Sequence, residues 1–71
     1  MRVLEVNYAD RLIDKKALRK LVPYSSSQIY RLEKAGLFPQ RIVLGAGRVA
    51  WLHSEVVQWI ENKAMERDAD V

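Results

Sequence analysis

Apolar residues recur at helical spacing in three stretches of the chain and alternate in a fourth. In the first stretch, Asp14 is a natural N-cap, and Pro23 disfavours helical backbone in the residue before it. The pattern predicts a first helix from Lys15 to about Val22. Its inward stripe is expected to consist of Ala17, Leu18 and Leu21.

The second helical stretch has both a start signal and a stop signal. The hydroxyl of Ser25 can accept from an unpaired amide of a first turn, and Gly36 suits the left-handed position after a helix. We therefore expect a helix over about 26–35, with Leu37 and Phe38 folding back as core. Its apolar face contains Ile29, Leu32 and Ala35, and its outer face Ser27, Tyr30, Arg31 and Lys34.

Strand-like alternation follows Pro39, which favours extended backbone. Residues 41–44 and 48–52 are typical of strands, and Gly45-Ala46-Gly47 between them is typical of a tight turn. This β-hairpin would need helices beneath it for stability. The alternating positions are Ile42 and Leu44 in the first strand and Val49 and Trp51 in the second.

A closing helix is predicted to begin near Ser54 as N-cap, with Glu55 at its positive end. The stripe that locks it onto the other helices consists of Val56, Trp59 and Ile60, with Lys63 at its solvent end. Beyond Met65 the stripe is lost, so residues 64–71 are expected to form a frayed acidic tail. Residues 1–10 indicate either a short edge strand or a loose arm.

The 71 residues leave room for one domain, with a small core. Two short helices with a tight break between them are typical of a helix-turn-helix. The predicted fold is α+β: a small winged helix-turn-helix over 11–63, with two helices, a β-hairpin wing over 41–52 and a C-terminal closing helix.

Charge is unevenly distributed along the chain. Residues 11–48 carry nine Lys or Arg against two Asp or Glu, a net of +7, whereas residues 52–71 carry two against five, a net of −3. This asymmetry predicts a polyanion-binding face in the basic part. The alternative is an ordinary solvated surface.

Other functional classes find little support in the sequence. There is no cysteine for a disulfide or a thiolate metal site, which fits a cytoplasmic protein, and no apolar run approaches the ~20 residues that span a bilayer. His53 has neither a triad partner nor a metal-ligand partner nearby. The Gly45-Ala46-Gly47 turn lacks the Lys-Ser/Thr of a phosphate loop. We expect no enzyme, no cofactor and no membrane contact.

A DNA duplex is the partner that the polar residues favour. The second helix is predicted to enter the major groove, where Gln28 could read adenine and Arg31 could reach guanine or a phosphate. Tyr30 could either contact a phosphate or pack under the hairpin. Candidate contacts on this helix are Ser25, Ser26, Ser27, Gln28, Tyr30, Arg31 and Lys34.

The hairpin and the first helix supply further candidate contacts. Arg48 follows the glycine turn and Arg41 opens the hairpin, so the hairpin could act as a wing against phosphates or the minor groove. An ordinary surface hairpin is the alternative. Lys15, Lys16 and Arg19 would clamp the DNA backbone, although Arg19 could instead pair with Glu33.

Several runs together resemble the AlpA-like prophage regulators, which are small winged-helix proteins related to MerR-type DNA-binding domains and phage excisionases. The resemblance spans about residues 11–62. The runs are Ser-Ser-Ser-Gln-Ile-Tyr-Arg-Leu, Lys-Ala-Gly-Leu-Phe-Pro, Arg-Ile-Val-Leu-Gly, Val-Ala-Trp and Ser-Glu-Val-Val-Gln-Trp-Ile.

The resemblance implies a sequence-specific regulator of phage or mobile-element genes. Its partners would be double-stranded DNA, a second copy bound cooperatively, and either an integrase or recombinase or RNA polymerase. Two alternatives stay open: an excisionase-like factor that bends DNA and recruits a recombinase, and a protein-interaction module that does not bind DNA.

Overall fold

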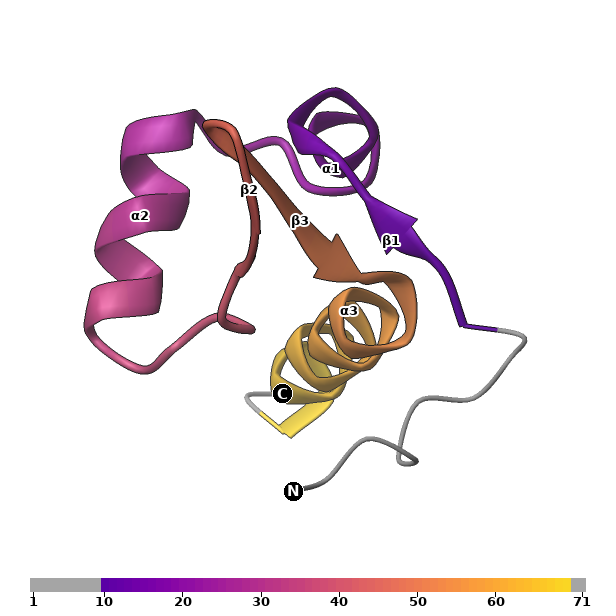
Figure 1. Ribbon diagram of the computed structural model, residues 1–71. Coiled ribbons are helices and arrows are strands. Elements are labelled where there is room, and N and C mark those ends of the chain that lie inside the picture. Colours follow the sequence, from indigo (N-terminus) through magenta and orange to yellow (C-terminus); the bar gives the residue numbers. More distant parts are fainter. Residues whose placement is uncertain (1–9, 70–71) are drawn as a thin grey trace, which may run out of the picture.

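A computed structural model describes residues 10–69 of the chain (Figure 1). The α+β class predicted from the sequence is confirmed. Residues 1–9, where an edge strand or arm was expected, lie outside the described residues. In chain order the elements are β1 Leu12–Ile13, α1 Lys15–Leu21, α2 Ser26–Lys34, β2 Ile42–Gly45, β3 Arg48–Leu52 and α3 His53–Ala69.

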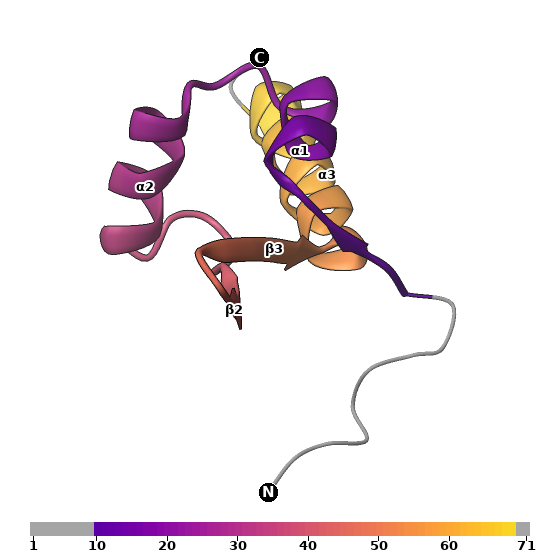
Figure 2. The ribbon, with the colours of Figure 1, turned by 45° about the horizontal axis from the view of Figure 1, so that its top comes forward.

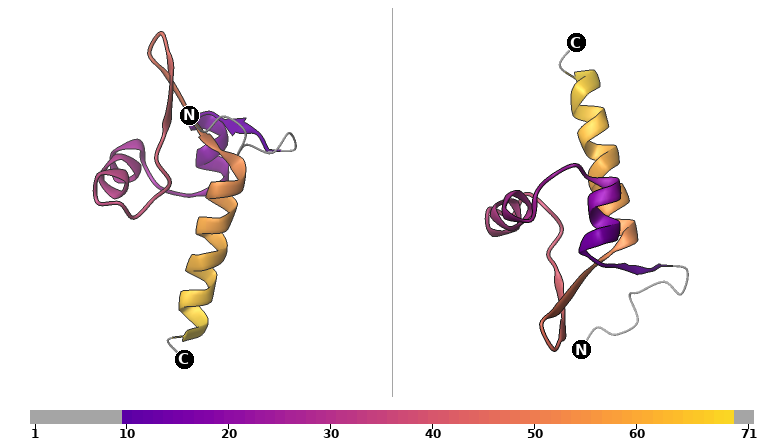
Figure 3. Two further views of the ribbon diagram at one scale, coloured as in Figure 1. Left: turned by 60° about the horizontal axis from the view of Figure 1, so that its bottom comes forward. Right: turned by 90° about the horizontal axis from the view of Figure 1, so that it is seen from above.

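The strands form a three-stranded antiparallel sheet in the order β1-β3-β2. Strand β1, which the sequence pattern did not predict, pairs Ile13 with Trp51 of β3. Helix α2 lies on one side of the hairpin, and α1 and α3 lie on the other (Figures 1 and 2). The hairpin tip and the C-terminal half of α3 project in opposite directions (Figure 3).

Helix α1 begins as predicted, because the Asp14 side chain accepts from the Ala17 amide at 2.8 Å. It ends at Leu21, and Val22 leaves the helix with extended backbone (φ −129°, ψ 119°). This change of direction carries Val22 into the core, where its exposure is 1%. Leu21, predicted to face inward, is instead 39% exposed.

Both end signals of α2 are confirmed. The Ser25 hydroxyl accepts from the Gln28 amide at 3.2 Å, and the Gln28 side-chain carbonyl accepts from the Ser25 amide at 2.9 Å, which completes a capping box. At the other end Gly36 has φ +74°, and its amide and that of Leu37 donate to carbonyls of the last helical turn. This is a Schellman motif.

Leu37 is exposed, contrary to its predicted place in the core. Its side chain is 60% exposed, whereas the next residue, Phe38, is buried as predicted. The Schellman turn commits the Leu37 backbone: its amide donates to the Leu32 carbonyl at 2.8 Å, and its carbonyl accepts from the Trp59 indole at 2.8 Å. Ala35, predicted to face inward, is also exposed, because it lies at the C-cap where the helix already ends.

Three consecutive residues at the hairpin turn have positive φ: Gly45 (99°), Ala46 (53°) and Gly47 (75°). Ala46 and Gly47 form the loop between the paired Gly45 and Arg48. Two consecutive positive φ values are what a type I′ hairpin turn requires. The pairing of β2 with β3 shifts register between Val43 and Gly45. Ile42 and Leu44, the predicted alternating positions of this strand, differ in burial: Ile42 is partly buried, whereas Leu44 is 53% exposed.

Helix α3 begins at His53, one residue before the predicted N-cap Ser54. The Asp10 carboxylate, 44 residues away in sequence, accepts from the Ser54 amide at 3.1 Å and from the Ser54 hydroxyl at 2.6 Å. A side chain distant in sequence thus accepts a hydrogen bond from an amide of the first turn, which has no partner within the helix. These two bonds from Ser54 hold the pKa of Asp10 below its ordinary value of 3.8.

Helix α3 continues to Ala69, through most of the segment expected to fray after Met65. Ala, Met, Glu and Arg all have high helix propensity, and Lys63 pairs with Glu66 at 3.4 Å. Every side chain from 61 to 67 is exposed. The end of this helix therefore rests on local propensity rather than on packing.

The core lies where the sheet meets the three helices. Trp59, half-buried beside it, packs edge-on against Phe38 with 4.9 Å between ring centroids, and against Tyr24 with 6.1 Å. No helix in the described part of the chain is long and apolar enough to span a bilayer. The buried cluster consists of Ile13, Leu18, Val22, Ile29, Phe38, Trp51 and Val56.

Candidate functional site

Helix α2 presents a polar face to solvent, as the periodicity predicts. Ile29 and Glu33 point inward and are buried. On a helix of 3.6 residues per turn, the residues opposite this pair are Ser27, Arg31 and Lys34, and all are exposed. Ser26 and Tyr30 lie on the flank that adjoins β2 and α1.

A basic crevice separates α1 from the start of α2. Ser26 at the first position of α2 faces it, and Leu18, Ile29 and Trp51 contribute its apolar floor. Its cationic lining consists of Lys15 and Arg19 from α1 and Arg41 from the segment before β2. The structure therefore brings together three cations and the amino end of the helix predicted to read DNA.

A second depression lies beside the crevice, at the tip of the wing. Lys15 and Lys16 at the start of α1 share it with Gly47 and Arg48 of the hairpin. Lys15 lines both depressions and so joins them. Arg48 and the two lysines, predicted separately as backbone contacts, thus lie around one depression, which Asp14 also lines.

Arg31 and Gln28 lie elsewhere on α2. They line a separate depression with Tyr24 and Leu32, and the Arg31 Nε lies 3.4 Å from the Ser27 carbonyl. The Gln28 carbonyl is already bonded to the Ser25 amide. A two-bond contact from Gln28 to adenine would therefore require the capping box to open, because that contact uses both the carbonyl and the amino group of the side chain.

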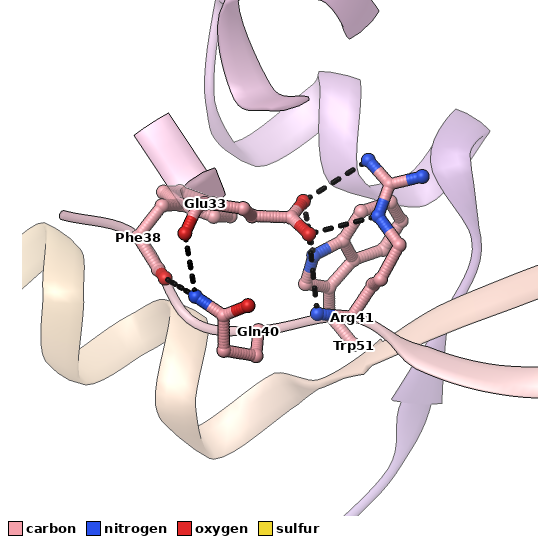
Figure 4. Close-up of polar contacts among 5 residues, drawn as sticks. All are labelled: Glu33, Phe38, Gln40, Arg41 and Trp51. Atoms are coloured by element: carbon pink, nitrogen blue, oxygen red, sulfur yellow. Dashed lines mark hydrogen bonds and ion pairs between the residues drawn. The ribbon is translucent and has the colours of Figure 1, made fainter. Parts of the chain in front are cut away.

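Glu33 is the buried acidic residue of α2, with 7% exposure (Figure 4). Its carboxylate accepts from Arg41 Nε at 2.8 Å and Nη2 at 3.1 Å, from the Arg41 amide at 3.3 Å and from the Trp51 indole at 3.3 Å. Gln40 Nε2 donates to the Glu33 carbonyl at 2.8 Å. Within residues 10–67, no buried side-chain nitrogen or oxygen lacks a hydrogen-bond partner.

Arg41, predicted to contact DNA, is engaged by Glu33. The hydrogen bonds that Arg41 donates to the Glu33 carboxylate raise the pKa of Arg41 above its ordinary value. The guanidinium carbon also lies 5.3 Å from the centre of the Trp51 ring. The alternative pairing of Arg19 with Glu33 is wrong, because Arg41 and Trp51 occupy the carboxylate.

Tyr30 is half exposed between two cations. Lys34 Nζ lies 5.4 Å from the centre of its ring and the Arg41 guanidinium carbon 5.6 Å. The ring is therefore not buried under the hairpin. These contacts extend the cationic surface from the crevice along α2.

Glu33 was missing from the predicted contacts of this region. Arg19, predicted either to clamp the DNA backbone or to pair with Glu33, lines the crevice. Glu33 had a detectable signal: it lies four residues after Ile29, so helical periodicity places it on the buried face. A carboxylate in that position needs a partner, but the spacing alone does not identify Arg41.

The described residues contain no group of three His, Asp or Glu side chains placed to hold a metal ion. The chemistry that this surface offers is hydrogen bonding and attraction of negative charge. Guanidinium and ammonium groups suit phosphate oxygens, and serine hydroxyls suit phosphates or base edges.

Two comparisons place the chain among known proteins. A family profile described as "Prophage CP4-57 regulatory protein (AlpA)" matches residues 11–64. The chain is also 38% identical over 58 residues to the "Uncharacterized protein ORF88" of Enterobacteria phage P4. That match covers 82% of this chain and 66% of the relative, so the chain spans slightly less than two thirds of the relative's length.

Proposed function

Because the chain belongs to the AlpA family of prophage regulatory proteins, we propose that it binds double-stranded DNA in a sequence-specific manner and regulates transcription of phage or mobile-element genes. A basic surface over two adjoining depressions, which share Lys15, is the observation that supports this proposal. It extends from the crevice beside Ser26, past Lys15, to Arg48 at the wing tip. Such a surface matches the charge of a duplex backbone.

In the proposed complex, α2 enters the major groove and the wing lies on the flank. Ser27, Arg31 and Lys34 are exposed opposite the core and face the base edges. Ser26 and Tyr30 lie between this face and the crevice and contact the phosphates at the groove edge. Lys15, Lys16 and Arg48 hold the next backbone segment. This division separates side chains that read sequence from those that fix position.

Binding should depend steeply on salt. If about five phosphates are neutralised, log affinity against log salt has a slope near −4.5 for duplex DNA. We would first select bound sites from a random duplex pool, then measure affinity for the selected site and for random duplex by fluorescence anisotropy at several salt concentrations. A flat salt dependence, or selection without a consensus, would contradict the proposal.

Matched variants separate the two kinds of contact. Arg48→Gln should weaken selected and random duplexes alike and make the salt slope shallower by about 0.9, the value for one phosphate. Arg31→Ala should weaken mainly the selected site. Lys63→Gln removes the same charge from an exposed position in the C-terminal half of α3 and should change neither affinity.

One observation favours a second candidate, an excisionase-like factor that bends DNA. Val43 and Leu44 on the wing are 75% and 53% exposed. Proteins that kink duplexes often insert apolar side chains between base steps. Circularly permuted DNA fragments would migrate differently in complex with such a factor. If all permuted fragments migrate equally in complex, the protein does not bend DNA, and the excisionase-like candidate is rejected.

A further inference from the structure

We propose that the ion pair between Glu33 and Arg41 is a specificity clamp: it fixes the reading helix against the wing and keeps one guanidinium from binding phosphate indiscriminately. The inference rests on the proposed DNA-binding function and deepens it. Neither residue would read a base. Both are positioning residues that raise the preference for the selected site over random duplex.

The first part of the clamp is geometric. Glu33 comes from the inner face of α2, Arg41 from the segment that leads into β2, and Trp51 from β3 (Figure 4). The carboxylate receives the fork of Arg41 through Nε and Nη2 and also the Trp51 indole. A two-bond guanidinium contact fixes orientation as well as distance. Rotation of α2 relative to the wing would therefore break several bonds at once.

The position of Gln40 reinforces this geometry. Its Nε2 donates to the Glu33 carbonyl at 2.8 Å and lies 3.4 Å from the Phe38 carbonyl. The end of α2 and the strand connection after it are thus tied through backbone as well as side chains. Base reading by α2 needs such fixed placement, because a misaligned donor loses the hydrogen bond that discriminates between bases.

The second part of the clamp is electrostatic. Arg41 lines the basic crevice together with Lys15 and Arg19, and its side chain is 25% exposed. While Arg41 is bound to Glu33, the carboxylate balances its charge at short range. Without Glu33, the guanidinium of Arg41 could turn toward a phosphate at the crevice. Phosphate contacts raise affinity for every sequence, so an additional contact narrows the gap between selected and random DNA.

The test compares Glu33→Gln with Glu61→Gln. Both remove one negative charge, but residue 61 is exposed on α3. Affinities for the selected site and for random duplex are measured against salt, and urea unfolding reports the folded fraction. For Glu33→Gln we expect tighter binding to random duplex, with a slope of log affinity against log salt that is steeper by about 0.9. The ratio of the affinity for the selected site to that for random duplex should fall at least about tenfold. For Glu61→Gln we expect the native slope and ratio.

A double variant separates geometry from charge. Glu33→Gln with Arg41→Gln leaves the net charge as in the native chain and keeps an amide that can accept from Trp51. It should restore the native salt slope while the ratio stays low. This pair of uncharged side chains also avoids an unbalanced buried charge, so it serves where Glu33→Gln alone unfolds.

The outcomes are distinguishable from one another. If the native chain shows no salt-dependent preference for any duplex, the proposed function fails and the clamp fails with it. If the native chain discriminates but the folded variants keep its ratio, only the clamp is overturned. A purely structural role would lower the folded fraction, which reduces both apparent affinities equally and leaves their ratio and the salt slope unchanged.

Discussion

Helix α2 is held on two sides by different physical means. Toward the wing, the buried carboxylate of Glu33 bonds to Arg41 and the Trp51 indole. Toward α3, the Phe38 and Trp59 rings pack edge to face, and the Trp59 indole donates to the backbone carbonyl of Leu37. Each side uses one tryptophan, but one acceptor is a charged side chain and the other a peptide group.

The two sides should differ in how they respond to change. An apolar contact loses stability roughly in proportion to the area removed, whereas a buried ionic network loses much more when one partner is missing. The wing side is therefore specific in orientation but intolerant of substitution. The α3 side is more tolerant, because any residue at 37 supplies the carbonyl.

The largest effect is expected from removing one partner of the ion pair. Arg41→Ala leaves the Glu33 side chain, only 6% exposed, with an unbalanced charge, so the free energy of unfolding should fall by about 4 kcal/mol. Glu33→Ala should cost less, about 2 kcal/mol, because the Arg41 side chain is 25% exposed and can reach water. Urea unfolding at neutral pH measures both, and equal losses would contradict this asymmetry.

The two tryptophans give a direct comparison of the sides. Trp51→Phe removes a donor to a carboxylate and should lower the free energy of unfolding by about 2 kcal/mol. Trp59→Phe removes a donor to a neutral carbonyl and should cost about 1 kcal/mol. Denaturation followed by circular dichroism checks both variants. A larger loss from Trp59→Phe would reverse the contrast.

Acid should affect the start of α3 through Asp10. Its pKa is lowered in the folded protein mainly by the Ser54 hydroxyl, so its contribution to stability is present above the ordinary value of 3.8 and is lost as pH falls through the lowered value. The native chain should therefore be more stable than the Asp10→Asn variant at neutral pH.

The gap between these two proteins in urea midpoint should narrow below pH 3.8. Ser54→Ala removes the hydroxyl donor. At neutral pH the native chain should also be more stable than this variant, by less than it is relative to Asp10→Asn. A gap that persists unchanged in acid would mean that the carboxylate charge is not what stabilises this contact.

The smallest effect is expected at the wing tip, outside both attachments of α2. Ala46 has φ +53°, which costs a residue with a Cβ about 1 kcal/mol. Asparagine tolerates this conformation better, so Ala46→Asn should raise the free energy of unfolding by about 0.5 kcal/mol. Urea unfolding would measure the gain, and Ala46→Val, with a β-branched side chain, should show a loss instead.

Local signals were sufficient for most of the fold. The capping pair of Ser25, the left-handed Gly36 and the Gly45-Ala46-Gly47 turn act over a few residues, so the elements they bound were predicted within a residue or two. The expectation at Leu37 was wrong because a hydrophobic residue beside a turn can direct either its side chain or its backbone inward.

Long-range partners could not be predicted in this way. Asp10 caps a helix 44 residues later, and Glu33 bonds to Trp51 18 residues away. Nothing in the spacing of charges specifies such pairs, because they exist only once the sheet has brought the segments together. For the proposed contacts, exposure of the outer face of α2 followed from periodicity, but the position of Arg31 away from the crevice did not.

The C-terminal part of α3 extends beyond the core, so the free energy of local opening should decrease along it. Up to residue 67, Ile60 is the last hydrophobic side chain that packs against the core, while the helix runs on to Ala69. Backbone amides in the final turns can therefore fray one after another at little cost. In hydrogen exchange, their protection should decline steadily from Ile60 toward Ala69 without any opening of the sheet.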